Sequence, residues 1–194
     1  IRLCQLVNLM DNGRPVKMSK RAGTFVTVRD VIDSVGADVI RFIMLTRRSE
    51  QTLDFDFARV TEQSRDNPVF YVQYAHARAC SVLRQAGDYA AVEAAMDRLD
   101  HPAEMEVLRH LASWPKLVIS AANAHEPHRI AFFLMDLAAS FHALWTAGRE
   151  APELRFIRED DAALTAARLR LVKATALVIR SGLGVLAIEA REEM

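Results

Sequence analysis

Residues 67–80 read NPVFYVQYAHARAC, and the apolar side chains in this stretch recur at the spacing of an α-helix. One face of the predicted helix carries Val69, Val72, Gln73, His76 and Cys80, and the neighbouring face carries Phe70, Tyr74 and Ala77. Because much of its circumference is apolar, we expect other helices to enclose it. Gln73 and His76 are interpreted as parts of a hydrogen-bonded joint, since buried histidines serve such joints more often than catalysis.

Helical patterns continue from about Phe57 to the end of the chain. Further helices are predicted to begin at Pro102, Pro127 and either Asp160 or Asp161. Pro115 is expected to kink the first of these or to divide it. The last should end near Gly182 or Gly184. No strong strand candidate follows residue 60, so the larger part of the chain is predicted to be an all-α bundle.

The residues before this bundle follow a different pattern. They predict a strand over 5–10, a turn over 11–13, a basic loop over 14–23, helices over 28–35 and 38–48, and an extended segment or turn over 52–57. Thr27 is the expected cap of the first helix, and Gly36 its stop. The composition changes near residues 48–56, which predicts two units, 1–50 and 51–194. The fold class is therefore mainly α.

Composition excludes several classes of protein. With 194 residues, 51% hydrophobic and 26% charged, the chain has the composition of a soluble globular protein. No apolar run approaches the roughly 20 uncharged residues of a spanning helix, so no membrane partner is expected. The two cysteines predict no disulfide framework and favour a reducing, cytoplasmic location. The six histidines show no metal-ligand spacing, and no structural metal is predicted.

Net charge gives no support for a nucleic-acid partner, because Lys+Arg and Asp+Glu both number 25. A local excess of basic residues does occur between Arg14 and Arg48, although an ordinary surface of mixed charge explains it about as well.

The loop over residues 16–24, VKMSKRAGT, contains the clearest chemical signal. Lys17 and Lys20 flank Ser19, and lysine is a compact charge on a flexible stem that can follow phosphate oxygens. A loop of this kind can close over a nucleotide, where its charges meet the negative charge of a transition state. The alternative is a solvated basic turn.

The sequence of this loop resembles a known signature. Lys17–Lys20, KMSK, is similar to the signature of class I aminoacyl-tRNA synthetases, and KMSKR followed by Ala-Gly is the form that arginyl-tRNA synthetases commonly use. The resemblance continues through Thr24–Asp30, Leu53–Asp56, Asn67–Arg78 and Glu126–Arg129, so it covers nearly the whole chain.

The resemblance implies a ligase that joins arginine to tRNA-Arg with ATP and Mg²⁺ through an arginyl-adenylate. Lys17 and Lys20 would be catalytic, stabilising the α-phosphate transition state and the departing pyrophosphate. Met18, Ser19 and Arg21 would complete the ATP-binding loop, with Met18 in a packing role. The family's other nucleotide signature, His-(Ile/Val)-Gly-His, is absent. We therefore expect residues 1–50 to be the end of a Rossmann-type catalytic domain whose larger part precedes Ile1, and the isolated chain to be inactive with neither ATP nor Mg²⁺ bound.

The remainder resembles the family's helical anticodon-binding domain, known as DALR, although the literal Asp-Ala-Leu-Arg does not occur. The implied partner is the anticodon stem-loop of tRNA-Arg, whose splayed bases favour aromatic platforms and cationic contacts. The candidate RNA-binding residues are Trp145, His142 and Tyr74 for bases, and Arg168 and Lys173 for phosphates. Trp145 could equally form a core pair with Phe141, and the cations could belong to a solvated helix face.

The sequence also allows two other interpretations of the chain's function. The loop also occurs in other class I ligases, such as cysteinyl and methionyl enzymes or a tRNA-independent cysteine ligase, which usually carry Lys-Met-Ser-Lys-Ser. The helices could also form an interaction module that binds RNA or protein without chemistry.

Overall fold

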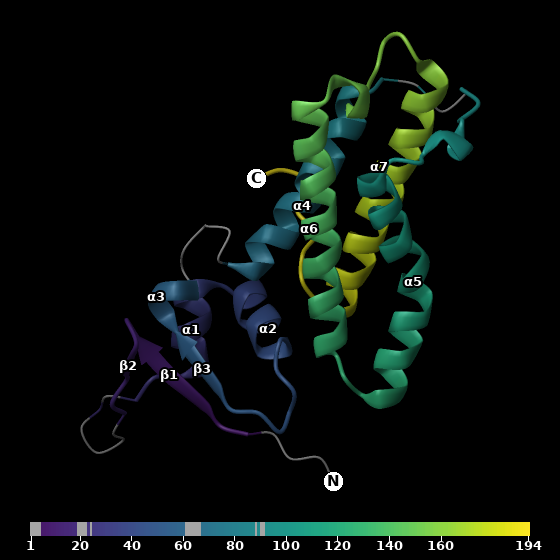
Figure 1. The fold of residues 1–194 in the computed structure, drawn as a ribbon. Helices are drawn as coiled ribbons and strands as arrows, with labels where there is room; N and C mark the ends of the chain where they lie inside the picture. Colours follow the sequence, from purple (N-terminus) through teal and green to yellow (C-terminus); the bar gives the residue numbers. More distant parts are fainter. Residues whose placement is uncertain (1–4, 19–22, 24, 61–66, 88, 90–91) are drawn as a thin grey trace.

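A computed structural model describes residues 5–18, 23, 25–60, 67–87, 89 and 92–194 of the chain, and Figure 1 shows a small sheet with short helices beside a bundle of long helices. The first part contains β1 (Val7–Asp11), β2 (Arg14–Pro15), α1 (Val28–Val35), α2 (Ala37–Leu45), β3 (Leu53–Asp56) and α3 (Phe57–Val60). The bundle contains α4 (Pro68–Gln85), α5 (Pro102–Ala124), α6 (His128–Glu150) and α7 (Ala162–Val185), with 3₁₀ turns at Met96–Arg98 and Pro152–Leu154. The mainly α fold class is confirmed.

The sheet has the strand order β2-β1-β3. β1 and β2 form an antiparallel hairpin, whereas β1 and β3 run parallel with Val7 opposite Leu53. A parallel pair needs a long crossover, and α1 and α2 lie within it. Phe55 packs with Val31 and Val60 in a small core of its own. Residues 53–60 therefore pack with the sheet, and the division into residues 1–50 and 51–194 stays a prediction.

The helices around the sheet follow local signals. The Thr27 hydroxyl accepts a hydrogen bond from the Asp30 backbone, and the Asp30 carboxylate accepts one from the Thr27 backbone, which completes a capping box at the start of α1. Gly36 has a φ of 86°, a conformation that glycine adopts without strain, and it ends α1 directly before α2 begins. The helix expected over 38–48 ends earlier, at Leu45, where the Thr46 hydroxyl donates to the Ile43 carbonyl.

The bundle packs α4 against α6 and α7, and α5 against α6 and α7. Its fully buried side chains include Val72, Leu134, Leu137, Phe141, Leu171 and Ile179. Pro115 lies inside α5 without dividing it. A proline removes one backbone hydrogen bond from a helix, and the packing of α5 along the bundle outweighs that loss.

α6 is the one helix among the described residues that is long and apolar enough to cross a membrane. Half of its apolar window is buried inside the bundle, as in the core helix of a soluble protein, so this composition is weak evidence for a membrane span.

The contact between α6 and α7 depends on Gly182. A Cβ atom at this position would lie 2.7 Å from Leu134 Cδ2, so the two helices approach closely only because the side chain is absent. We expect Gly182→Ala to lower the free energy of unfolding by about 1–3 kcal/mol through overpacking, as measured by urea denaturation. Gly184→Ala is the matched control on the same helix, because nothing lies within 4 Å of its Cβ position. Equal stability of the two variants would contradict close packing at Gly182.

Candidate nucleic-acid interface

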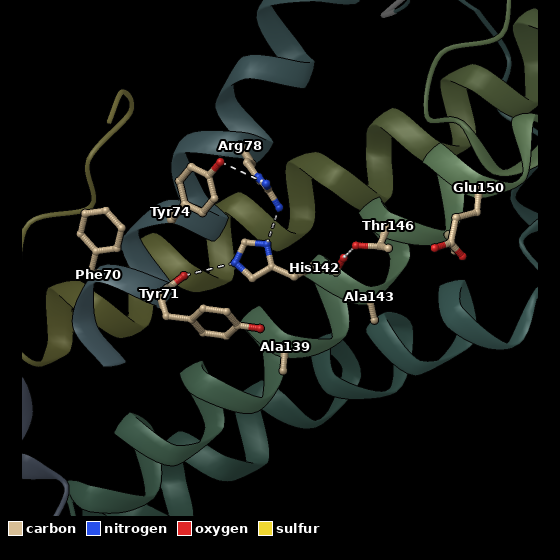
Figure 2. Close-up of a pocket in the computed structure, with 10 residues that line it drawn as sticks. Phe70, Tyr71, Tyr74, Arg78, Ala139, His142, Ala143, Thr146 and Glu150 are labelled. Carbon is tan, nitrogen blue, oxygen red and sulfur yellow. Dashed lines mark hydrogen bonds between the residues drawn. The ribbon is translucent and has the colours of Figure 1, made fainter. Parts of the chain in front are cut away.

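A groove of about 710 Å³ runs between α4 and α6. Figure 2 shows Tyr74, Arg78 and His142 pointing toward one another in its centre, with Glu150 at one end. The tyrosine and the arginine come from α4, and the histidine and Glu150 come from α6. The sequence block around residues 67–78 and the helix that follows Pro127 therefore meet in one surface.

Arg78 is the central residue of this surface, and the sequence analysis gave it no role. Its guanidinium lies 4.3 Å from the centre of the Tyr74 ring and 5.0 Å from that of the Trp145 ring. Its Nη2 donates to the Tyr74 hydroxyl over 3.0 Å. A half-buried guanidinium close to two aromatic rings forms a surface on which a base can stack and to which anions are attracted. The signal for it was the four-residue spacing from Tyr74 to Arg78, which places both on one helix face.

His142 fixes the position of Arg78. Its Nε2 lies 3.3 Å from the Tyr71 carbonyl, which can only accept, so Nε2 carries the proton. Its Nδ1 then accepts a hydrogen bond from Arg78 Nη1 over 3.1 Å. The ring lines the groove but is buried, so we assign His142 to orienting Arg78 rather than to stacking against a base.

A second cavity, of about 670 Å³, adjoins the first across Tyr74 and Arg78. It adds Arg84, Trp145 and Arg149, together with residues 192–194 at the end of the chain. Trp145 is half-buried and packs against the bundle core and the Phe156 ring, so it is both a core residue and a wall of this cavity. Trp145 thus packs partly against the core, and its role as a platform for a base stays a prediction.

The last eight residues run along α4 and complete this surface, and Figure 1 shows the C-terminal end beside that helix. Gln73 Nε2 donates to the Glu189 carbonyl over 2.9 Å, and His76 Nδ1 donates to the Arg191 carbonyl over 2.9 Å. Gln73 Nε2 also lies 3.4 Å from the Asp38 carboxylate of α2. Gln73 therefore connects the bundle to α2, as predicted for this block, whereas His76 binds the C-terminal segment.

Charges at the end of the chain face the second cavity. Arg84 lies 3.6 Å from the exposed Glu193 carboxylate, and Arg180 lies 2.9 Å from Glu192. Behind them, burial raises the pKa of the Cys80 thiol, and the nearby Glu192 carboxylate raises it further. The thiol is thus a neutral core group, and the exposed ion pairs contribute little to stability.

Arg168 does not face solvent, which corrects its assignment as a phosphate contact. Its side chain is 4% exposed, and its Nε donates over 2.6 Å to the carboxylate of Glu104, which is 1% exposed. Its Nη1 donates to the carbonyls of Glu153 and Arg155. The Arg168 guanidinium is therefore paired with the Glu104 carboxylate inside the protein, where no RNA phosphate reaches it.

Lys173 is exposed, as expected, but lies apart from the α4–α6 surface. It lines a cavity of about 340 Å³ beside Tyr89 and Arg170. The structure thus brings together Tyr74, His142 and Trp145, and separates Lys173 from them.

Of the predicted nucleotide loop, Lys17 and Met18 are described and exposed to solvent. Ser19, Lys20 and Arg21 lie outside the described residues. Within the described part of the chain, no group of three or more His, Cys, Asp or Glu side chains could hold a metal ion.

Comparisons with known proteins agree with the sequence resemblance. The family described as "DALR anticodon binding domain" matches residues 72–194. The whole chain is 57% identical to the arginine–tRNA ligase of Rhodospirillum rubrum and 56% identical to that of Ruegeria pomeroyi, of which it covers 34% and 35%. It therefore spans about a third of the length of these curated relatives.

Solved structures show the same similarity. A candidate arginyl-tRNA synthetase from Campylobacter jejuni aligns with 99% of the chain and 40% of its own length, at 29% identity and a TM-score of 0.84. The arginyl-tRNA synthetase of Thermus thermophilus aligns with 98% of the chain and 35% of its own length, at 26% identity and a TM-score of 0.71. With the larger part of its length matched from residue 72 to the end, this chain belongs to the DALR anticodon-binding domain family.

Proposed function

We propose that this chain is the part of a cytoplasmic arginine–tRNA ligase that binds the anticodon stem-loop of tRNA-Arg and supplies the KMSKR loop. The whole enzyme would attach arginine to tRNA-Arg with ATP through an arginyl-adenylate. Support comes from relatives named arginine–tRNA ligase that match the entire chain at 57% and 56% identity, which favours arginine over the other class I ligases. The structural observation behind the RNA-binding role is Arg78, held between the Tyr74 and Trp145 rings where two cavities meet.

The geometry suits an unstacked RNA loop. Splayed bases bind by stacking on aromatic and guanidinium planes, and the Tyr74 and Trp145 rings lie 4.3 Å and 5.0 Å from the Arg78 guanidinium. Arg84 and Arg149 at the second cavity would contact the phosphates that connect these bases. The Arg84–Glu193 pair is exposed and therefore weak, so a phosphate can replace the carboxylate at little cost.

The KMSKR loop would serve the chemical step. In this proposal Lys17 and Lys20 meet the charge that develops on the phosphates of ATP, and Met18, Ser19 and Arg21 shape the loop. Magnesium in nucleotide sites is held largely by substrate phosphates and one or two carboxylates. We therefore expect Mg²⁺ to enter the site of the whole enzyme together with the phosphates of ATP.

Tyr74→Ala tests the stacking surface. Tyr74 is 36% exposed, so removing its ring should weaken binding of the tRNA-Arg anticodon stem-loop by about 1–3 kcal/mol while the protein stays folded. The dependence of affinity on salt should change little, because Tyr74 carries no charge. Fluorescence anisotropy at two salt concentrations measures both quantities. Trp145→Ala should also weaken binding, with an added loss of stability because the indole packs against the core.

Phe132→Ala is the matched control, since this ring is 46% exposed on α6 and lines none of the cavities described above. Equal affinity of the Tyr74 and Phe132 variants would remove the α4–α6 groove from the RNA interface. Equal affinity of the unaltered chain for cognate and non-cognate stem-loops would defeat anticodon recognition.

A further inference from the structure

A cavity of about 280 Å³ lies where the first part of the chain meets the bundle, at the other end of α6 from Trp145. One side is formed by the end of α2 and the loop over residues 46–52, and the other by the turn between α5 and α6. Figure 1 shows the start of α6 beside the loop that follows α2. The volume is below the roughly 300–1,000 Å³ of most small-molecule sites, so the cavity admits only a small ligand.

The His128 imidazole lines this cavity and has no hydrogen-bond partner among the described residues. The residue is 7% exposed, and its ring meets the Phe132 ring edge-on at 6.2 Å between centroids. A buried polar group without a partner costs free energy, so native structures rarely contain one. Because no side-chain nitrogen of the described residues is both sealed from solvent and unpaired, the His128 ring nitrogens are reached through the cavity. The imidazole is therefore placed to bind a ligand there.

The start of α6 adds a backbone donor at the same place. Pro127 is the N-cap, and no side chain caps the helix. The N–H groups of Arg129 and Ile130 bind the carbonyls of Glu126 and Pro127, whereas the His128 N–H has no acceptor in the part of the chain that the structure describes. The N-terminus of a long helix carries a partial positive charge, so this open donor favours an anion.

Arg47 and Arg48 bring two positive charges to the opposite side of the cavity. Both are exposed, and neither forms a salt bridge with a carboxylate of the described residues. Their loop is anchored by backbone hydrogen bonds, from the Gln5 N–H to the Ser49 carbonyl over 2.8 Å and from the Gln51 N–H to the Arg48 carbonyl over 3.0 Å. The loop therefore holds both cations beside the cavity.

Two carboxylates also line the cavity, and one of them is already bound. Arg129 Nε donates to the Glu126 carboxylate over 2.5 Å. This hydrogen bond lowers the pKa of Glu126, and the charges of Arg129, His128 and Arg48 lower it further. The other carboxylate, Glu50, is exposed to solvent. The surroundings of the cavity therefore keep an excess of positive charge, which favours an anionic ligand.

We propose that this cavity binds a small inorganic phosphate, orthophosphate or pyrophosphate, between the loop after α2 and the start of α6. The His128 ring and the N–H at the start of the helix donate to its oxygens, and Arg47 and Arg48 neutralise its charge. A free phosphate fits better than an RNA phosphate, because the donor ring is 7% exposed and lies in a cavity too small for a nucleotide within a strand.

The ligand contacts both the first part of the chain and the bundle, so its binding stabilises their association. The lining residues of this cavity are all different from those of the α4–α6 groove, and the inference does not depend on the proposed function.

Isothermal titration calorimetry of the 194-residue chain with orthophosphate and with pyrophosphate, at constant ionic strength, tests the site. One saturable site is expected. His128→Phe keeps a buried ring but removes both ring nitrogens, and it should weaken binding about 10- to 100-fold, the range for loss of a hydrogen bond to a charged group. Arg48→Ala should weaken binding by a similar factor. His110→Phe and Arg109→Ala, on α5 outside the cavity, are the matched controls and should leave affinity unchanged.

Melting temperatures give a second readout. At the same phosphate concentration, the unaltered chain should gain more in melting temperature than His128→Phe, a comparison that removes the general stabilisation of proteins by excluded phosphate. Absence of saturable binding would overturn the proposal, as would equal affinity of the His128, Arg48 and control variants. The small-anion site would also be wrong if a tRNA-Arg transcript without its anticodon arm bound through Arg48 while neither inorganic phosphate bound. If His128→Phe does not fold, Arg48→Ala decides the matter, because Arg48 is exposed.

Discussion

Arg168→Ala is expected to lower the free energy of unfolding by about 3–5 kcal/mol, because it leaves the Glu104 carboxylate buried without its cation. Both side chains are almost fully buried, so water cannot replace the lost partner without opening the bundle. For a protein of this size, each kcal/mol corresponds to about 2–4 °C in melting temperature. Thermal and urea unfolding followed by circular dichroism measure the loss.

Two controls test whether the loss of stability in Arg168→Ala comes from the unpaired Glu104 carboxylate. Arg180→Ala removes an exposed arginine from the same helix and should cost less than about 1 kcal/mol. The double variant Glu104→Leu with Arg168→Met removes both charges and should recover part of the loss. If Arg168→Ala were as stable as Arg180→Ala, the buried ion pair would not be a support of the fold.

Lys20→Ala in the full-length ligase is expected to reduce kcat for aminoacylation by about 10²–10³, equivalent to roughly 3–4 kcal/mol, with a much smaller effect on KM for arginine or tRNA. The reason is the sequence pattern, which places Lys20 in a loop suited to charge that appears mainly in the transition state. Steady-state kinetics with each substrate varied in turn measure the two parameters.

Lys116→Ala is the matched control, because Lys116 is an exposed lysine on α5 in the bundle. An unchanged kcat with a raised KM for tRNA in the Lys20 variant would remove this lysine from the chemistry. Pyrophosphate exchange by the isolated 194-residue chain above a no-enzyme control would overturn the expectation that it is inactive.

Those parts of the fold that depend on neighbouring residues could be predicted from the sequence. The capping box of Thr27 and Asp30 and the Asp161 cap of α7 both lie within four residues of the groups that they bind, so the sequence shows them directly. The pairing of β3 with β1 could not be predicted, because it joins Val7 to Leu53 and neither segment has a pattern that identifies the other. The contact of residues 53–56 with the sheet was therefore not part of the prediction.

The difference between local and distant contacts also explains which residues of the candidate site could be predicted. Tyr74 and Trp145 could be selected by residue type, since aromatic residues on helices suit RNA bases. The spacing from Tyr74 places Arg78 on the same helix face, but its contact with His142, 64 positions later in the chain, could not be predicted. Arg168 was misassigned for the same reason, as its partner Glu104 precedes it by 64 positions and a cation on a helix usually faces water.

The segment that runs along α4 at the end of the chain has a consequence for the order of folding. The hydrogen bonds that connect it to α2 and α4 join residues separated by 108 to 151 positions, from Arg84–Glu192 to Asp38–Glu189. Contacts between such distant residues close the largest loops and form slowly, whereas the helices can associate with their neighbours first. The bundle is therefore expected to assemble before the proposed RNA-binding surface is complete. In the native protein, we expect the reverse step to be undocking of residues 187–194, which would open the second cavity while the four helices stay packed.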